Sequence, residues 1–194
     1  MQLGFFFDQT RCTGCCTCVS ACKDWHDIPA GPVNWMKVST LENGGFPNVS
    51  VIHMIRPCYH CARPSCLEAC DYGAILKRES DGIVLVDRDL CVACKECEDA
   101  CPYGAPQFAV DGDPEMQKCD FCLERLEGGK SPICVEACPM VAIEIGPLQE
   151  LRNKFGQKIE AEGFQYNRRF KPSVVFRPKH WTRKPDPIRK ETVT

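Results

Sequence analysis

The chain lacks any long apolar run. No stretch approaches the roughly 18 consecutive apolar residues that a membrane-spanning helix requires, so we expect no direct membrane insertion and assign any membrane link to a partner. The first ten residues, MQLGFFFDQT, also lack the basic region and the apolar core of a secretion signal. We therefore expect the chain to fold in the cytoplasm, where disulfides rarely form.

A strong net charge is also missing, because the formal charge is only −2. The charges are distributed unevenly, with 12 Lys and Arg against 4 Asp and Glu in residues 151–194, and 12 against 22 in residues 1–150. A basic segment can bind nucleic acid, but four prolines in this one favour an extended segment lying on another protein. We predict a basic, proline-rich tail that docks on a partner, and no nucleic-acid partner.

Histidine is scarce, with 4 residues, whereas cysteine is abundant, with 17 among 194 residues. Such enrichment is typical of a disulfide scaffold, a zinc protein or an iron–sulfur protein. The length allows one domain or two small lobes.

The spacing of the cysteines separates these classes. Sixteen of them form four sets of four, each opening with a Cys-x2-Cys hook and closing with a Cys-x3-Cys step, and Cys16 is left over. The sets are Cys12, Cys15, Cys18 and Cys22; Cys58, Cys61, Cys66 and Cys70; Cys91, Cys94, Cys97 and Cys101; and Cys119, Cys122, Cys134 and Cys138.

This recurring pattern matches the bacterial ferredoxin run, in which the fourth cysteine ligates the other cluster of a pair. A [4Fe–4S] cubane needs four thiolates, and a tight loop can supply three while its N–H groups turn toward the cluster sulfurs. The third and fourth cysteines of every set are four residues apart, so a short helix can carry the fourth thiolate to a neighbouring cluster. The sequence therefore predicts iron–sulfur clusters in linked pairs.

The alternatives explain less of the pattern. A zinc ribbon needs two hooks and has no use for the repeated Cys-x3-Cys step, and a disulfide framework needs an oxidising compartment. Cys16 is interpreted as a small buried apolar residue and not as a ligand. Four thiols per set leave no ligand role for His60, and we expect Trp25, His26 and Trp35 to be core or interface residues.

Short apolar runs flank the sets and are predicted as strands: LGFFFD, VSVIHMI, GIVLVD and VAIEIG. Alternation of strand, cysteine loop and short helix predicts a loop-rich α+β fold made of two ferredoxin-like modules. We expect a body of residues 1–150, in which residues 1–25 and 115–148 form an outer module and residues 50–108 an inner one. LGFFFD would then pair near VAIEIG, and residues 151–194 would form the extended tail.

Longer stretches resemble the four-cluster iron–sulfur subunits of the dimethyl sulfoxide reductase family of molybdenum and tungsten enzymes, above all the iron–sulfur subunits of dimethyl sulfoxide reductases. The similarity spans about residues 1–156 and rests on GFFFDQTRCTGCCTCVSACKDWHD, CVACKECEDACPYGAPQF, KCDFCLERLEGGKSPICVEACP and AIEIGPLQELRNKFG.

The resemblance implies an electron relay with no catalytic residue in this chain. Single electrons would pass between a large catalytic subunit, which alone carries Mo- or W-molybdopterin, and a quinone-linked membrane subunit or a soluble carrier. The resemblance implies four [4Fe–4S] clusters, because cysteine fills all sixteen ligand positions, position 94 included. The implied ligand sets are Cys12, Cys15, Cys18 and Cys138; Cys119, Cys122, Cys134 and Cys22; Cys58, Cys61, Cys66 and Cys101; and Cys91, Cys94, Cys97 and Cys70.

Two other functions fit the cysteine pattern. A free-standing soluble polyferredoxin is the first, although a carrier needs no basic tail. An electron-transfer subunit of a formate dehydrogenase or related complex is the second, because another chain would select the substrate. The final location would be the cytoplasm, or outside it as a passenger of a partner that carries an export signal.

Overall fold

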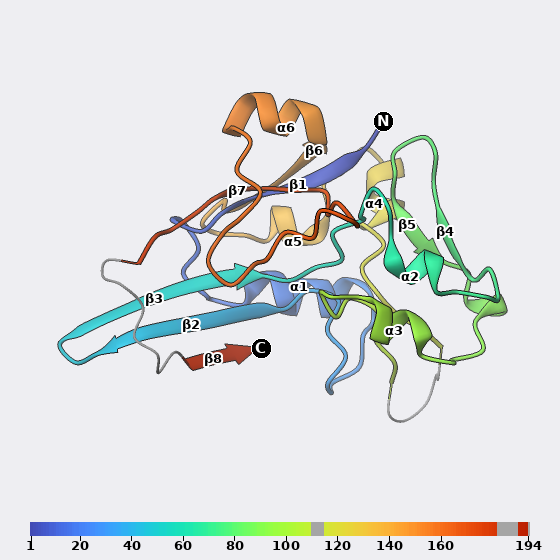
Figure 1. Cartoon of the computed structure of the whole chain (residues 1–194), viewed down its shortest axis with the longest axis horizontal. Coiled ribbons are helices and arrows are strands. Elements are labelled where there is room, and N and C mark those ends of the chain that lie inside the picture. Colours follow the sequence, from blue (N-terminus) through green and yellow to red (C-terminus); the bar gives the residue numbers. More distant parts are fainter. Residues whose placement is uncertain (110–114, 182–189, 194) are drawn as a thin grey trace.

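The computed structural model describes residues 1–109, 115–181 and 190–193 (Figure 1). Its helices and strands are short and are joined by long loops. In chain order they are β1 (Leu3–Asp8), α1 (Thr17–Trp25), β2 (Val38–Gly45), β3 (Asn48–Ile55), α2 (Ser65–Glu68), β4 (Ile75–Lys77), β5 (Val84–Val86), a 3-10 turn (Arg88–Leu90), α3 (Glu96–Ala100), α4 (Leu123–Glu127), α5 (Ile133–Glu136), β6 (Ile143–Pro147), α6 (Leu148–Phe155), β7 (Val174–Arg177) and β8 (Lys190–Val193).

Mixed helices and strands in small sheets confirm the α+β class, and the four apolar runs contain β1, β3, β5 and β6. No helix in the described part of the chain is long and apolar enough to cross a membrane. The division into two modules stays a prediction.

A three-stranded sheet in the order β6-β1-β7 lies at the centre of the fold. β1 runs antiparallel to β6, with Phe5 opposite Ile145, so the predicted pairing of LGFFFD with VAIEIG is confirmed. The strand is an uninterrupted apolar run because both of its faces are covered. Phe5 and Phe7 face the main core, while Phe6 stacks on Phe155 of α6 at a ring distance of 3.7 Å.

The third strand of this sheet, β7, comes from the predicted tail and runs parallel to β1. Gly4 permits the close approach, since a Cβ atom there would lie 2.6 Å from the carbonyl oxygen of Ser173. Part of the tail is therefore an element of the body. Residues 182–189 and 194 of the tail lie outside the described residues.

A long hairpin of β2 and β3 extends away from the cysteine loops, and β8 lies along β2 (Figure 1). Phe46 at its tip is 97 % exposed and is followed by a cis peptide bond to Pro47. β2 was not predicted, because its sequence VSTLENGG combines buried Ser39 and Asn43 with two glycines and lacks a regular apolar alternation.

The β4–β5 hairpin and the helices α2 and α3 enclose a smaller core. The turn of this hairpin contains Asp81 and Gly82, and Asp81 Oδ1 accepts a hydrogen bond from Ile83 N at 3.0 Å. The buried members include both sulfur and apolar side chains: Cys66, Ile75, Val84, Cys97 and Met116.

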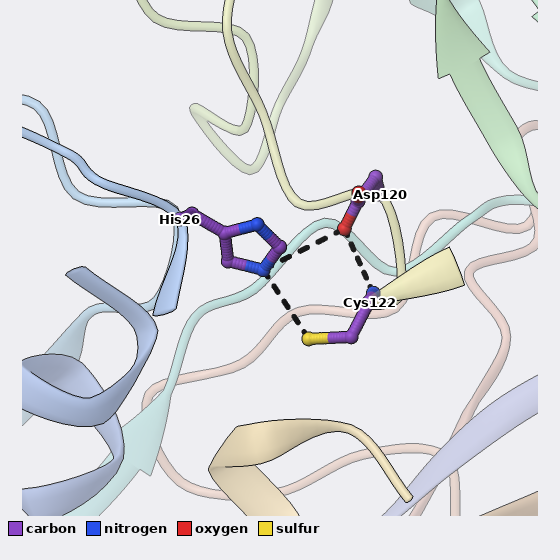
Figure 2. Close-up of side chains that lie close together, drawn as sticks. All are labelled: His26, Asp120 and Cys122. Carbon is purple, nitrogen blue, oxygen red and sulfur yellow. Dashed lines mark hydrogen bonds and ion pairs between the residues drawn. The ribbon is translucent and has the colours of Figure 1, made fainter. Parts of the chain in front are cut away.

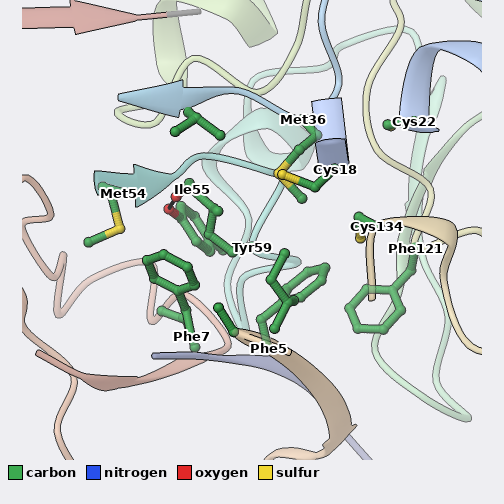
Figure 3. Packing of buried hydrophobic residues seen from close by; sticks show 14 of the residues in the cluster. Phe5, Phe7, Cys18, Cys22, Met36, Met54, Ile55, Tyr59, Phe121 and Cys134 are labelled. Atoms are coloured by element: carbon green, nitrogen blue, oxygen red, sulfur yellow. Dashed lines mark hydrogen bonds between the residues drawn. The ribbon is translucent and has the colours of Figure 1, made fainter. Parts of the chain in front are cut away.

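The main core joins the central sheet to the cysteine loops (Figure 3). Phe5 lies against Phe121 with ring centroids 4.6 Å apart, and Tyr59 packs edge-on against Phe164. Cys18, Cys22 and Cys134 are buried members of the same cluster. The fold therefore places thiols inside its hydrophobic core, where their chemistry depends on burial.

Candidate iron–sulfur centres

All 17 cysteines lie among the described residues, and none forms a disulfide. Sixteen of them approach one another in four groups of four, which are named here after one member each. The Cys12 group is Cys12, Cys15, Cys18 and Cys138; the Cys119 group is Cys22, Cys119, Cys122 and Cys134; the Cys58 group is Cys58, Cys61, Cys66 and Cys101; and the Cys91 group is Cys70, Cys91, Cys94 and Cys97.

The Cys12 group lines an apolar cavity, and Cys16 contributes to the same wall. Burial raises the pKa of Cys18 to about 12, and the neighbouring charges of Cys12 and Cys138 contribute to this rise. Cys138 comes from the loop before β6, and its Sγ accepts a hydrogen bond from Ala142 N at 3.3 Å. This thiol therefore crosses from the fourth cysteine set to the first.

The Cys119 group is the more deeply enclosed of the two groups in the main core. Cys22 on α1 meets Cys134 on α5 because these two helices pack together. Burial and the charge of Cys122 raise the pKa of Cys22 to about 12, and burial raises that of Cys119 well above its ordinary value.

The Cys58 group lies between the main core and the smaller one. Burial raises the pKa of Cys66 to about 12, where Cys58 and Cys101 add to the effect and the amine of Lys118 opposes it. Burial raises the pKa of Cys101, and the backbone N–H groups of Tyr103, Gly104 and Ala105 oppose this rise because they favour its thiolate.

The Cys91 group lines a second apolar cavity. Cys70 reaches this cavity from the end of α2, whereas the other three thiols come from the loop before α3 and from α3 itself. Burial raises the pKa of Cys97 to about 11, and Met116 N donates a hydrogen bond to Cys91 Sγ at 3.4 Å.

One backbone feature recurs in all four hooks. The residue directly before the second cysteine has a positive φ, and only one of the four is glycine: Gly14 (70°), His60 (43°), Ala93 (56°) and Phe121 (67°). A left-handed residue in a tight loop turns successive N–H groups inward and forms a concave anion site. Non-glycine residues adopt this conformation at a cost of roughly 1–2 kcal/mol, so the surrounding structure must hold them there.

The donor chemistry fits an iron–sulfur cluster in each group. Four thiols converge in a mostly apolar setting in each group. Burial raises the pKa values of the buried thiols Cys18, Cys22, Cys66 and Cys97, and repulsion by neighbouring thiolates adds to the rise. A bound metal group supplies the positive charge that such thiolates require. Thiolates are soft ligands that suit iron–sulfur clusters or zinc. The backbone N–H groups that face inward can donate hydrogen bonds to the sulfides of a cluster.

Each group lies close enough to the next for their charges to interact, and this succession of four neighbouring groups is called the row. Burial is the main cause of the raised pKa values of Cys22, Cys119 and Cys66, and the charges of Cys18, Cys58 and Cys97, in that order, add to them. These three pairs connect the Cys12 group to the Cys119 group, the Cys119 group to the Cys58 group, and the Cys58 group to the Cys91 group. The two exposed thiols of the row, Cys15 and Cys94, are found in the two end groups.

Two side chains that the cysteine spacing did not identify lie beside the Cys119 group (Figure 2). His26 Nε2 is 3.3 Å from Cys122 Sγ and 3.7 Å from Asp120 Oδ1. Asp120 Oδ1 also accepts a hydrogen bond from Cys122 N at 2.7 Å. Burial lowers the pKa of His26, although the nearby Asp120 carboxylate opposes this shift.

His26 was predicted only as a core or interface residue, because 96 positions separate it from Cys122. Trp35 packs against its ring at a tilt, with centroids 4.5 Å apart, whereas Trp25 is 40 % exposed and lies under the guanidinium of Arg125. His60 is completely buried, and its Nδ1 accepts a hydrogen bond from Val84 N at 2.9 Å.

Comparison with known proteins gives a consistent result. Residues 49–148 match the family model of the 4Fe-4S dicluster domain. The sequence is 42 % identical over 186 residues to the probable anaerobic dimethyl sulfoxide reductase chain YnfG of Escherichia coli K12, covering 91 % of this chain and 89 % of that protein. It is 41 % identical over 185 residues to the B chain of anaerobic dimethyl sulfoxide reductase from the same organism, with the same coverage of both proteins. The B subunit of sulfite dehydrogenase from Allochromatium vinosum is 34 % identical over 226 residues, covering 100 % of this chain and 94 % of that protein.

Proposed function

The protein belongs to the 4Fe–4S dicluster family that includes the B chains of anaerobic dimethyl sulfoxide reductases, and from this membership we propose that it relays single electrons within an oxidoreductase complex. The observation that carries the proposal is the row of four thiol groups. A row of redox centres that ends in an exposed thiol at each side suits transfer through the protein from one partner to another.

We propose one [4Fe–4S] cluster in each thiol group. The Cys12, Cys119, Cys58 and Cys91 groups would then use sixteen cysteines as iron ligands and leave Cys16 without a ligand role. Cys16 is only partly buried, not fully buried as the sequence predicted, and it lines the same cavity as the Cys12 group. Its sulfur donates a hydrogen bond to the carbonyl oxygen of Gly14 at 3.4 Å, which supports a non-ligand role.

When bound, the clusters would supply one-electron oxidation and reduction, whose potentials span roughly −700 to +450 mV among proteins. The residues of this chain would hold and tune them. Thiolates would fix the clusters in place, and N–H groups such as those of Met116 and Ala142 would donate to the ligating sulfurs and stabilise added negative charge. Buried side chains such as Phe121 would exclude water from the central groups.

The two-module organisation remains part of this proposal. Contacts between α1 and α5 and between α2 and α3 support an outer and an inner module. The smaller core lies mostly within the inner range, whereas the main core includes residues of both ranges. The β2–β3 hairpin lies mostly between the two predicted ranges, because β2 precedes residue 50 and only β3 reaches the inner module. Strand β7 attaches part of the tail to β1 of the outer module.

A catalytic partner follows from the family, since its relatives are named as chains or subunits of reductases and dehydrogenases. We propose a large subunit with Mo- or W-molybdopterin, and a membrane-anchor subunit or a soluble carrier at the other end of the row. The remaining tail would lie across the large subunit. The complex would reside in the cytoplasm or be exported with the partner that carries the signal.

The test is an oxygen-free purification of the native complex, with identification of its chains and assays of iron, molybdenum and tungsten. The proposal predicts about sixteen irons in this chain, a large partner that contains Mo or W, and four signals in electron paramagnetic resonance (EPR) after stepwise reduction. A monomer with the same iron content would support the free polyferredoxin instead. Zinc without iron would refute any electron-transfer function.

A further inference from the structure

The side chain of His26 lies at the one point in the described part of the chain where a titratable ring touches a proposed iron ligand of the buried Cys119 group. We propose that His26 donates an Nε2–H···Sγ hydrogen bond to the Cys122 thiolate and thereby raises the reduction potential of that cluster above the value set by its thiolates alone. This inference rests on the proposed function, because it requires Cys122 to be an iron ligand.

The geometry determines which atom donates. Both atoms near His26 Nε2 are acceptors in the cluster-bound state, namely the Cys122 thiolate at 3.3 Å and the Asp120 carboxylate oxygen at 3.7 Å. A bare ring nitrogen facing two anionic acceptors would be repelled, so the tautomer with the proton on Nε2 is favoured. The shorter contact, within the limit for hydrogen bonds to sulfur, identifies Cys122 as the acceptor.

The surroundings hold the ring in place. The Trp35 ring packs against it at a tilt of 37° with centroids 4.5 Å apart, and the side chain of His26 is only 12 % exposed. Asp120 fixes the other side, because its Oδ1 also accepts the hydrogen bond from Cys122 N at 2.7 Å (Figure 2). The ring, the carboxylate and the ligand sulfur therefore form one connected arrangement, which orients the donor before reduction occurs.

Reduction adds a negative charge that is spread over the cluster and its thiolates. A donor hydrogen bond stabilises the reduced form more than the oxidised form, because the acceptor sulfur carries more charge. The effect is larger at a buried site than in water, since the local dielectric constant is lower. Loss of the donor should therefore make this cluster harder to reduce.

A mononuclear metal site made by His26, Asp120 and Cys122 is the competing interpretation, since their ligand atoms lie within 4.8 Å of one another. The structure favours a donor role, because Cys122 already converges with three other thiols and Asp120 Oδ1 already accepts a backbone hydrogen bond. Metal analysis of the purified complex separates the two: stoichiometric zinc that is lost in a His26 variant would overturn the proposal.

The decisive experiment is an EPR-monitored redox titration of the intact complex with two substitutions at one position. His26→Phe keeps a ring against Trp35 but removes the donor, whereas His26→Gln keeps an N–H donor at a similar reach. We expect His26→Phe to lower one of the four reduction potentials. At a fixed solution potential, the ratio of reduced to oxidised cluster should fall several-fold to tenfold, and tenfold corresponds to about 59 mV for one electron. His26→Gln should restore most of the shift.

A second readout tests the contact directly. Pulsed EPR of protein with nitrogen-15 in histidine alone should show a coupling between one reduced cluster and a histidine nitrogen that disappears in His26→Phe. Unchanged potentials in His26→Phe, or equal shifts in both variants, would overturn the inference. Wild-type protein without four clusters would instead refute the proposed function, so the two failures are distinguishable.

Discussion

Lys118 donates a hydrogen bond from its buried amine to the carbonyl oxygen of Val84. The residue is only 2 % exposed, and its second acceptor is the carbonyl oxygen of Cys119 at 3.0 Å. Among the ion pairs of the described residues, none includes Lys118. A buried cation is expensive to maintain without an anion, and the proposed clusters of the Cys58 and Cys119 groups are the anions beside it.

Replacing Lys118 with methionine should therefore lower the reduction potential of the cluster held by the Cys58 group. The amine favours the thiolate of Cys66, and its loss removes a positive charge that stabilises the reduced state. We expect at least a tenfold change in the ratio of reduced to oxidised cluster, about 59 mV, in an EPR-monitored titration. Lys154→Met, which removes an exposed lysine on α6, serves as the control, and an equal shift there would contradict the assignment.

The iron content should distinguish Cys94 from Cys16. Cys94→Ala should remove one of about sixteen irons and leave a three-iron cluster in the Cys91 group, because Cys94 is the exposed member and its loss disturbs the packing least. Cys16→Ala should leave iron unchanged, since Cys16 is proposed as a non-ligand. Iron analysis and EPR of the oxidised protein measure both. Loss of iron in Cys16→Ala would show that the ligand set is wrong.

Two glycines with similar backbone angles should respond differently to alanine. Gly14 (φ 70°) lies in the first hook, where a Cβ atom would lie 2.4 Å from the His53 ring, whereas nothing lies within 4 Å of a Cβ atom at Gly129 (φ 72°). Gly129→Ala should destabilise the protein by about 1–2 kcal/mol from backbone strain alone. Gly14→Ala should destabilise it more and lower its iron content. Thermal unfolding of the iron-loaded protein measures the loss of stability in each variant. Equal losses in Gly14→Ala and Gly129→Ala would contradict the prediction.

Removal of iron should unfold much of the main core. Cys18, Cys22 and Cys134 are buried members of that core, and without metal their repulsion and burial favour neutral thiols that no longer link α1 to α5. Oxygen-free treatment with a chelator should increase cleavage by proteases and abolish near-ultraviolet circular dichroism, because metal binding and folding are coupled. Iron and sulfide should restore both signals. Cooperative unfolding that persists after complete iron removal would contradict this expectation.

The sequence predicted the elements that carry a strong local signal. β1 is a continuous apolar run and β6 alternates apolar and polar residues, and each lies beside a cysteine set. Their pairing followed from the order of those sets. β2 and β7 were missed for different reasons. Polar residues and glycines weaken the signal of β2, whereas β7 is a short run, VVFR, within a segment whose basic charge suggested a partner surface.

The candidate sites show the same limit. Spacing alone indicated four sets of thiols and clusters in linked pairs, because a repeated pattern of sixteen residues is visible without a fold. The specific ligand sets came from the resemblance to the family and stay a prediction. The contact between His26 and Cys122 was invisible, since neither residue type nor spacing links positions so far apart. Lys118 likewise resembles an ordinary lysine until the fold buries it.

The parallel pairing of β7 with β1 has a consequence for synthesis on the ribosome. The first hook, with Cys12, leaves the ribosome long before Cys138, and β1 stays unpaired on one edge until the strand that begins at Val174 is made. At the usual rate of about 5–20 residues per second, that interval is on the order of ten seconds. During it, three thiols and an apolar strand are exposed without their partners. The Cys12 group is therefore the first to begin forming during translation and one of the last to be completed. A chain truncated before Cys138 would carry three thiols of this group without the fourth.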